Sequence, residues 1–134
     1  MSLNIIRKIL EQRLDLLPAL STARMNVNYI PTTGVAHQRL ALITAEPDNP
    51  ILGGGNYYRE QGIFQITLCY PQNTAIDAIN ARAELTRAQF NRGLGLSDSG
   101  ITVMIAKTAK YGAAFQDAGW YCMPIIIEWY SHIN

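Results

Sequence analysis

The sequence contains few charged residues and no block of one sign. Charged residues make up 16% of its 134 positions, against about 25% in a typical soluble domain. Eleven basic and ten acidic residues leave a formal charge of +1, and the lysines and arginines form no run. Proteins whose affinity rests on phosphate contacts carry such a basic patch. We therefore expect no specific nucleic-acid binding, and the low charge predicts that another protein covers part of the surface.

Long apolar runs are absent as well. Arg7, Lys8 and Glu11 interrupt the apolar residues at the N-terminus, where a secretory signal would need an unbroken apolar centre. No later segment supplies the roughly 18 consecutive apolar residues that a membrane-spanning helix requires. The sequence thus predicts a soluble, non-exported product that does not contact a membrane.

Residues that could ligate a metal or act as nucleophiles are scarce. Cys69 and Cys122 are the only cysteines and both lie in apparent strands, so we expect reduced thiols buried in a sheet. His37 and His132 are the only histidines, and neither has a second ligand at metal-binding spacing. They are predicted to be solvated polar residues, and neither a metal nor a cofactor is expected.

The remaining candidates for chemistry are better explained as loops and turns. Gly53, Gly54 and Gly55 lack the Lys-Ser/Thr pair of a phosphate loop and precede a strand, whereas a phosphate cradle needs a helix N-terminus behind it. Residues 97–100 have the composition of a turn, and Asp117 beside Gly119 is typical of a turn former. These patterns predict a protein that is not an enzyme.

Hydrophobic periodicity predicts two helices and several strands. Helices are expected over 3–17, ending before Pro18, and from Thr74 to about Asn91. Period-two alternation and short apolar segments predict strands at 25–30, 39–45, 62–70, 101–108 and 119–130. The order of these elements predicts one domain over 1–134 of the α+β class. Its mainly antiparallel sheet would have four to five strands, with two principal helices packed on one face.

The last predicted strand is apolar on both faces. Ile125, Ile127 and Trp129 would share one face, while Trp120 and Ile126 lie on the other. Pro124 cannot donate a ladder hydrogen bond, so we expect an edge strand or a bulge there. Two helices cover only one face of a sheet. A neighbouring subunit is the simplest cover for the other face, and a longer loop folding over it is the alternative.

The segment from Pro47 to Tyr58 is long for a strand connection, which predicts either a functional or a mobile loop. Just after its glycines come Tyr57, Tyr58 and Arg59, and tyrosine and arginine are common in the buried centres of interfaces. The alternative is that one tyrosine packs on the core and the arginine is solvated. We interpret the following residues as a candidate interface with another protein subunit: Gly53, Gly54, Gly55, Tyr57, Tyr58, Arg59 and Trp129.

Several short motifs resemble the tail-terminator-like proteins of siphophages. The likeness covers nearly the whole chain and includes the two predicted helices. It rests on structural residues and contains no catalytic signature. The motifs are Ala45-Glu46-Pro47, Gly53-Gly54-Gly55, Arg59, Gly62, Phe64-Gln65, Tyr70-Pro71, Asp117, Gly119-Trp120-Tyr121, Pro124, Ile125 and Ile127.

The resemblance implies a structural protein of the virion tail, assembled in the host cytoplasm. It implies a homo-oligomer, a six-membered ring, that caps the tail tube, ends polymerisation of the tube protein and offers a surface to the head-completion or connector protein. DNA would pass through the ring without specific binding, which the near-neutral charge allows.

Two other functions fit the same sequence. Another neck or tail-completion subunit would share this composition and bind a connector in place of the tube. A small oligomeric ligand-binding protein or enzyme could use Tyr57, Arg59 and Asp117 around an anionic ligand. A concave pocket with convergent polar groups would mark this second alternative.

Overall fold

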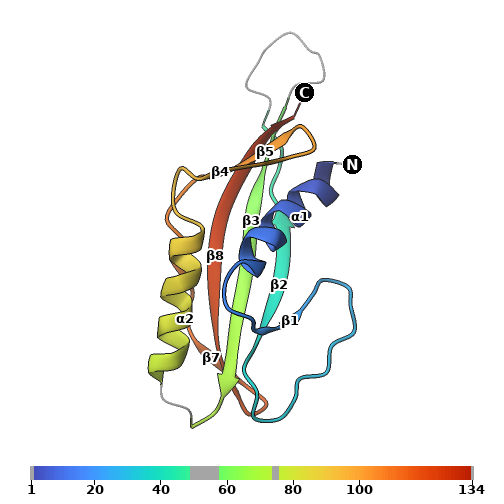
Figure 1. Cartoon of the computed structure of the whole chain (residues 1–134). Coiled ribbons are helices and arrows are strands. Elements are labelled where there is room, and N and C mark those ends of the chain that lie inside the picture. The colour runs from blue at the N-terminus through green and yellow to red at the C-terminus, as the bar shows by residue number, and fades with distance from the viewer. Residues whose placement is uncertain (1, 49–57, 74–75, 134) are drawn as a thin grey trace.

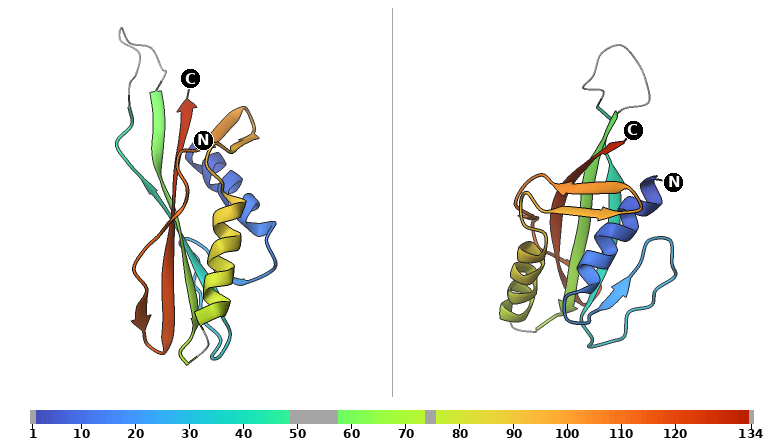
Figure 2. Two further views of the ribbon diagram at one scale, coloured as in Figure 1. Left: turned by 90° about the vertical axis from the view of Figure 1, so that its left-hand side faces the viewer. Right: turned by 45° about the horizontal axis from the view of Figure 1, so that its top comes forward.

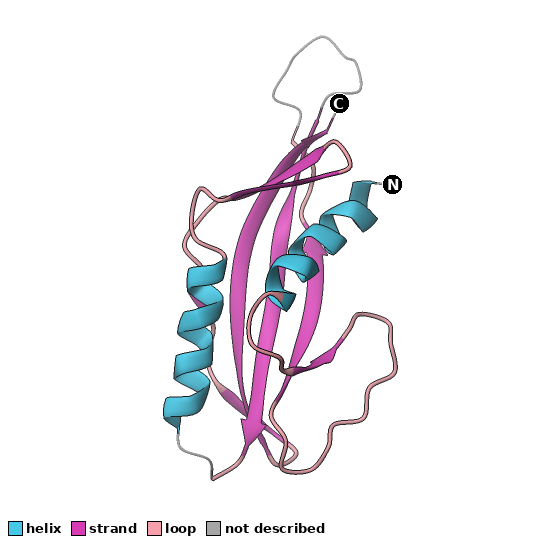
Figure 3. Ribbon diagram, in the orientation of Figure 1, coloured by secondary structure: helices cyan, strands magenta, loops and turns pink. Residues whose placement is uncertain are grey.

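A long, twisted sheet with two helices against one face makes up the protein (Figures 1 and 2). The computed structural model describes residues 2–48, 58–73 and 76–133. Strands account for most of the regular structure (Figure 3). In chain order the elements are α1 (Ser2–Asp15), β1 (Ser21–Ala23), β2 (His37–Thr44), β3 (Tyr58–Pro71), α2 (Ile76–Gln89), β4 (Gly95–Asp98), β5 (Ile101–Ile105), β6 (Lys110–Tyr111), β7 (Phe115–Asp117) and β8 (Trp120–Ile133).

The sheet differs from the sequence prediction. Over the described ranges it has eight strands in the order β1-β2-β3-β8-β5-β4, with β6 and β7 also paired to β8. It is mixed, because β1 runs parallel to β2. The prediction of a mainly antiparallel sheet of four to five strands is therefore wrong. The strands it missed have two to four residues each, too few for a period-two pattern to be recognised.

The antiparallel pair β3–β8 runs through the middle of the sheet. Fourteen residues of each strand pair, from Tyr58 opposite Ile133 to Pro71 opposite Trp120. Since side chains alternate along a strand, one face presents a continuous apolar surface to the helices. Its fully buried members on the two strands are Phe64, Ile66, Leu68, Ile125, Ile127 and Trp129.

The helices complete this core. α1 contributes Ile6, Leu10 and Leu14, and α2 contributes Ile79 and Ala83, all at most 1% exposed. The C-terminal turns of the helices are also tied together.

This connection is reciprocal. The Nε of Arg13 donates to the carbonyl of Gln89 at 3.0 Å, and the Nε2 of Gln89 donates to the carbonyl of Arg13 at 2.8 Å. Carbonyls in the last turn of a helix have no partner within the helix. The two bonds therefore satisfy orphan carbonyls and fix the position of one helix against the other.

Pro124 lies inside the sheet, so the edge-strand alternative is wrong. The bulge alternative describes the site, because three residues, 112–114, face Met123 and Pro124 between the Tyr111–Ile125 and Phe115–Cys122 pairs. The Pro124 carbonyl accepts a hydrogen bond from the Gly112 nitrogen at 2.8 Å. The nitrogen and carbonyl of a strand residue point to the same side. The missing N–H therefore faces the gap between β6 and β7, and the β3–β8 ladder loses no bond. A Cβ on Gly112 would lie 2.5 Å from the Pro124 ring, so glycine is required there.

Two predictions about individual side chains are also wrong. Cys69 and Cys122 were expected as reduced thiols, but they are register partners on β3 and β8 and form a disulfide. His37, expected to be solvated, is fully buried beside Cys69 in the register and packs edge-on against Trp120 at 4.6 Å. His132 is exposed. The errors for the cysteines and for His37 have one cause: strand register brings these residues together, and register cannot be read from composition.

The strand predicted at 25–30 does not form. Residues 24–36 instead make a long connection between β1 and β2. The hydroxyl of Tyr29 shares a hydrogen bond with the Ser21 hydroxyl at 2.7 Å, and its ring lies 5.6 Å from the His37 ring. The sulfur of Met25 accepts from the backbone of Leu42 at 3.1 Å. Side chains therefore hold this connection to the sheet in place of a strand ladder.

Gly62 allows β2 and β3 to approach closely. It is paired with Thr44 on one side and Trp129 on the other, and an added Cβ would collide with the carbonyl oxygen of Ile43. We expect Gly62→Ala to lower the free energy of unfolding by about 1–3 kcal/mol, as for other overpacked sites. Urea denaturation would measure this loss.

Gly95→Ala is the matched control for this prediction. Gly95 is also a strand glycine, but its added Cβ would meet only the flexible side chains of Met104 and Thr102. An equal loss of stability in the two variants would contradict the close-approach explanation.

Burial of His37 predicts a pH-dependent stability. Desolvation, followed by the nearby positive charge of Arg39, lowers the pKa of His37 below its ordinary value. Below about pH 6.5 the unfolded chain therefore binds more protons than the folded chain. The contribution of neutral His37 to the free energy of unfolding is complete above this pH and is lost as the pH falls. Thermal unfolding at about pH 7.5 and about pH 5 would measure the change. His37→Gln should reduce the difference, whereas His132→Gln, at an exposed position, should retain it.

Candidate assembly surface

The β2–β3 hairpin extends the sheet beyond both helices (Figure 2). Past the Thr44–Gly62 pair, the Ala45 nitrogen donates to the carbonyl of Gln61 at 2.8 Å. Asp48 and Arg59 then exchange two backbone hydrogen bonds of 2.9 and 2.7 Å. The segment from Ala45 to Asp48 contains one residue more than the segment that faces it. This is a bulge, which bends and twists the hairpin.

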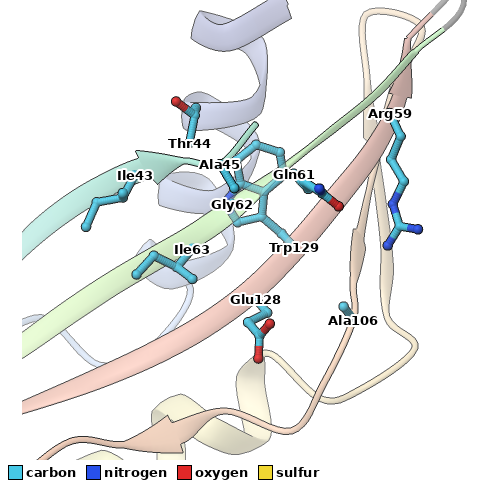
Figure 4. Close-up of a pocket in the computed structure, with 10 residues that line it drawn as sticks. All are labelled: Ile43, Thr44, Ala45, Arg59, Gln61, Gly62, Ile63, Ala106, Glu128 and Trp129. Atoms are coloured by element: carbon cyan, nitrogen blue, oxygen red, sulfur yellow. The ribbon is translucent and has the colours of Figure 1, made fainter. Parts of the chain in front are cut away.

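An open cavity of about 430 Å³ lies at the base of this extension (Figure 4). Neighbouring strands and the residue after β5 supply its walls. The lining residues are Ile43, Thr44, Ala45, Arg59, Gln61, Gly62, Ile63, Ala106, Glu128 and Trp129. The cavity is therefore built by the sheet and the connection that follows β5.

Arg59 is held by an aromatic ring. Its guanidinium carbon lies 4.2 Å from the centroid of the Tyr130 ring, and its buried Nε has no hydrogen-bond partner among the residues that the structure describes. Glu128, in the same cavity, is 3.7 Å from the Lys107 amine, but both side chains are substantially exposed. Such surface pairs contribute little to stability. The cavity thus presents a stacked cation and a solvated acidic group.

The sequence-predicted interface residues fall into three places. Gly53, Gly54, Gly55 and Tyr57 lie outside the described residues. Tyr58 and Arg59 begin β3 and are half-buried. Trp129 lies in the core at 1% exposure, opposite Gly62, with no partner for its buried indole nitrogen within the described ranges. Its place in the core allows it to support the cavity wall from within.

The anionic-ligand site considered from the sequence is not assembled. Arg59 pairs with His132, whereas Asp117 pairs with Trp120 at the opposite end of β8. Asp117 instead lies 3.3 Å from Arg39 and precedes the tight turn at Ala118 and Gly119, where φ is 45° and 91°. In the described part of the chain, no three potential ligands gather to hold a metal. No helix there is long and apolar enough to cross a membrane.

Sequence reasoning missed a second exposed apolar region. The connection between β1 and β2 carries three exposed aliphatic side chains, Val27 at 61%, Ile30 at 82% and Val35 at 47%. Figure 1 shows this connection far from the β2–β3 hairpin extension. The sequence signal for this region was the presence of Val27, Ile30 and Val35 in a segment without the regular alternation of a strand. We call residues 24–36 the β1–β2 loop surface.

The open face of the sheet is also partly apolar. Ile43 is 49% exposed and Phe115 is 43% exposed. β6 and β7 are hydrogen-bonded to β8 and therefore widen the sheet beside that strand. Neither helix packs on this face, and Ile43, which lines the cavity, remains open. We call the cavity and the neighbouring Ile43 the hairpin surface.

The comparisons identify the class of protein, a structural component of bacteriophage tails. The family model described as phage tail terminator protein matches residues 5–129. The chain therefore belongs to the phage tail terminator protein family. This confirms the family resemblance noted in the sequence and places the protein in the virion tail.

The fold has a counterpart among solved structures. One protein chain is similar with a TM-score of 0.79 and 22% sequence identity, and the alignment covers 100% of this chain and 97% of that one. At this identity the likeness demonstrates the fold alone. No curated protein matches the sequence.

Proposed function

We propose that this protein ends the tail tube. Six copies would form a ring that caps the tube, stops addition of further tube protein and offers a surface to the head-completion or connector protein. Membership of the tail terminator family supports this role. The near-neutral charge is compatible with DNA passing through the ring, since strong phosphate binding would hinder transit.

The presence of two separated apolar surfaces on one chain supports a ring. Cyclic assemblies use heterologous contacts, in which one patch of a subunit meets a different patch of the next. The hairpin surface exposes Ile43, and the β1–β2 loop surface exposes Val27 and Ile30. The loop leads into the first residue of β2 and Ile43 lies next to its last residue, so the two surfaces lie toward opposite ends of this strand (Figure 1). In the proposed ring, the first surface of each subunit contacts the second surface of its neighbour.

The proposed contacts with the tube come from the segment that joins β2 to β3. We assign it Gly53, Gly54, Gly55, Tyr57, Tyr58 and Arg59. Arg59 is the described anchor, because its guanidinium is already oriented on Tyr130. Trp129 contributes indirectly by packing beside Gly62 where the hairpin leaves the core (Figure 4).

The ring proposal predicts a discrete mass. Six copies of 14.9 kDa give 6 × 14.9 = 89.4 kDa, which native mass spectrometry separates from one copy. Ile43→Asp and Ile30→Asp should each abolish the hexamer, because a carboxylate would be buried in the contact. Neither should change monomer stability by more than about 0.5 kcal/mol, since both side chains are exposed.

Leu85→Asp is the matched control, since Leu85 on α2 is 47% exposed and Ile43 is 49% exposed. This variant should keep the hexamer. Loss of the ring in the control and in both test variants would contradict the assignment of these two surfaces.

Capping predicts a measurable effect on tube length. Purified tube protein should form tubes that lengthen without limit, and added terminator should hold them at the length reached when it is added. Deleting residues 51–56 should remove this effect, as counted by electron microscopy. If the deletion left both ring formation and capping intact, the proposed tube contact would be wrong. A neck protein that binds only a connector would leave tube length unchanged.

A further inference from the structure

A second cavity, of about 270 Å³, lies where the C-terminal end of α1 meets β1, β2 and α2. It is separate from the hairpin surface. Polar side chains and the backbone that follows α1 supply its walls. The lining residues are Leu14, Asp15, Leu17, Pro18, Ala19, Leu20, Thr22, Arg24, Gln38 and Arg82.

Arg82 is a buried cation without a carboxylate. Its side chain belongs to α2, and the residue is 8% exposed. Its Nη1 donates to the carbonyl of Pro18 at 2.7 Å, and its buried Nε has no hydrogen-bond partner among the residues that the structure describes. Within the described ranges no acidic group lies at ion-pair distance from it. Burial lowers the pKa of Arg82, the direction expected when a charge is taken from water without compensation.

The other charges around the cavity are already paired. Arg24 binds Glu11 at 2.7 Å and Asp15 at 2.9 Å, and Arg7 binds Glu11 at 2.8 Å. Together with Arg82 this makes three guanidinium groups against two carboxylates, a balance of 3 − 2 = +1. The surplus charge is that of Arg82. A neutral carbonyl and the C-terminal dipole of α1 offset only part of it.

Gln38 adds an acceptor to the same cavity. It is 2% exposed, and its Nε2 donates to the Thr22 hydroxyl at 3.0 Å. That hydroxyl donates to the carbonyl of Leu20 at 2.8 Å, so the orientation of the amide is determined. The Gln38 Oε1 is buried and accepts no hydrogen bond from the described part of the chain. Buried polar groups without partners are costly and few in native proteins.

We propose that this cavity binds a carboxylate that carries an adjacent amide N–H, with the carboxylate on Arg82 and the N–H on the Oε1 of Gln38. An acidic residue or a chain end of an adjoining tail protein has this chemistry. That choice of source rests on the proposed role in the tail, whereas the site itself does not. A planar guanidinium is suited to this ligand because it can bind both carboxylate oxygens.

The test uses the wild-type protein and three small probes. N-acetylglycine carries the carboxylate and the N–H, N-acetylglycinamide lacks the carboxylate, and inorganic phosphate represents a free anion. Each is titrated at constant ionic strength while the Nε–H resonance of Arg82 is followed by NMR. We expect a saturable shift with N-acetylglycine alone. No saturable shift, or an equal shift with N-acetylglycinamide, would overturn the site. Saturation by phosphate alone would overturn the carboxylate assignment.

A pair of variants locates the binding. Arg82→Gln should weaken N-acetylglycine binding by about tenfold or more, the loss expected for a charge-assisted hydrogen bond. Arg92→Gln changes the net charge equally at an exposed position and should bind as the wild type does. Equal weakening in the two variants would indicate a nonspecific charge effect and overturn the site. The titration of the wild type remains decisive if Arg82→Gln fails to fold, and it requires neither ring formation nor tube capping.

Discussion

The antiparallel pairing of β3 with β8 is the interaction on which the rest of the structure depends. It joins two strands far apart in the sequence over fourteen residue pairs. β2 attaches to one side, and β5, β6 and β7 attach to the other. The apolar side chains of one face create the surface on which both helices pack. Gly62, Pro124 and the Cys69–Cys122 disulfide all lie on these two strands.

This arrangement leaves the two faces of the sheet in different states. The helices bury the central part of the first face, whereas neither helix packs on the second, which exposes Ile43 and Phe115. Exposed apolar patches of this kind usually mark sites of association. The β2–β3 hairpin continues the sheet past the helices, so the surfaces available for assembly follow from the geometry of the core.

Several of the few charged residues of the chain gather near the C-terminal end of α1. Around the end of α1, Arg7, Glu11, Arg24 and Asp15 form a closed network of ion pairs. Arg82 lines the same cavity as Arg24 and Asp15 and has no carboxylate at ion-pair distance among the described residues. An isolated buried charge is costly, which makes this cavity different from the solvated Lys107–Glu128 pair at the hairpin surface. The two regions differ in burial: Arg82 is buried, whereas Lys107 and Glu128 are exposed to solvent.

The sequence by itself determined the helices, the three long strands and the family, because these depend on periodicity over many residues and on local motifs such as Tyr70-Pro71. It also indicated that the last strand needs cover on both faces. Only the tertiary structure decided the sheet of eight strands, the burial of His37, the disulfide and the isolation of Arg82. Each of these depends on strand register or on contacts between distant segments. Composition carries no record of register, since a shift of one residue leaves the same sequence facing the opposite side.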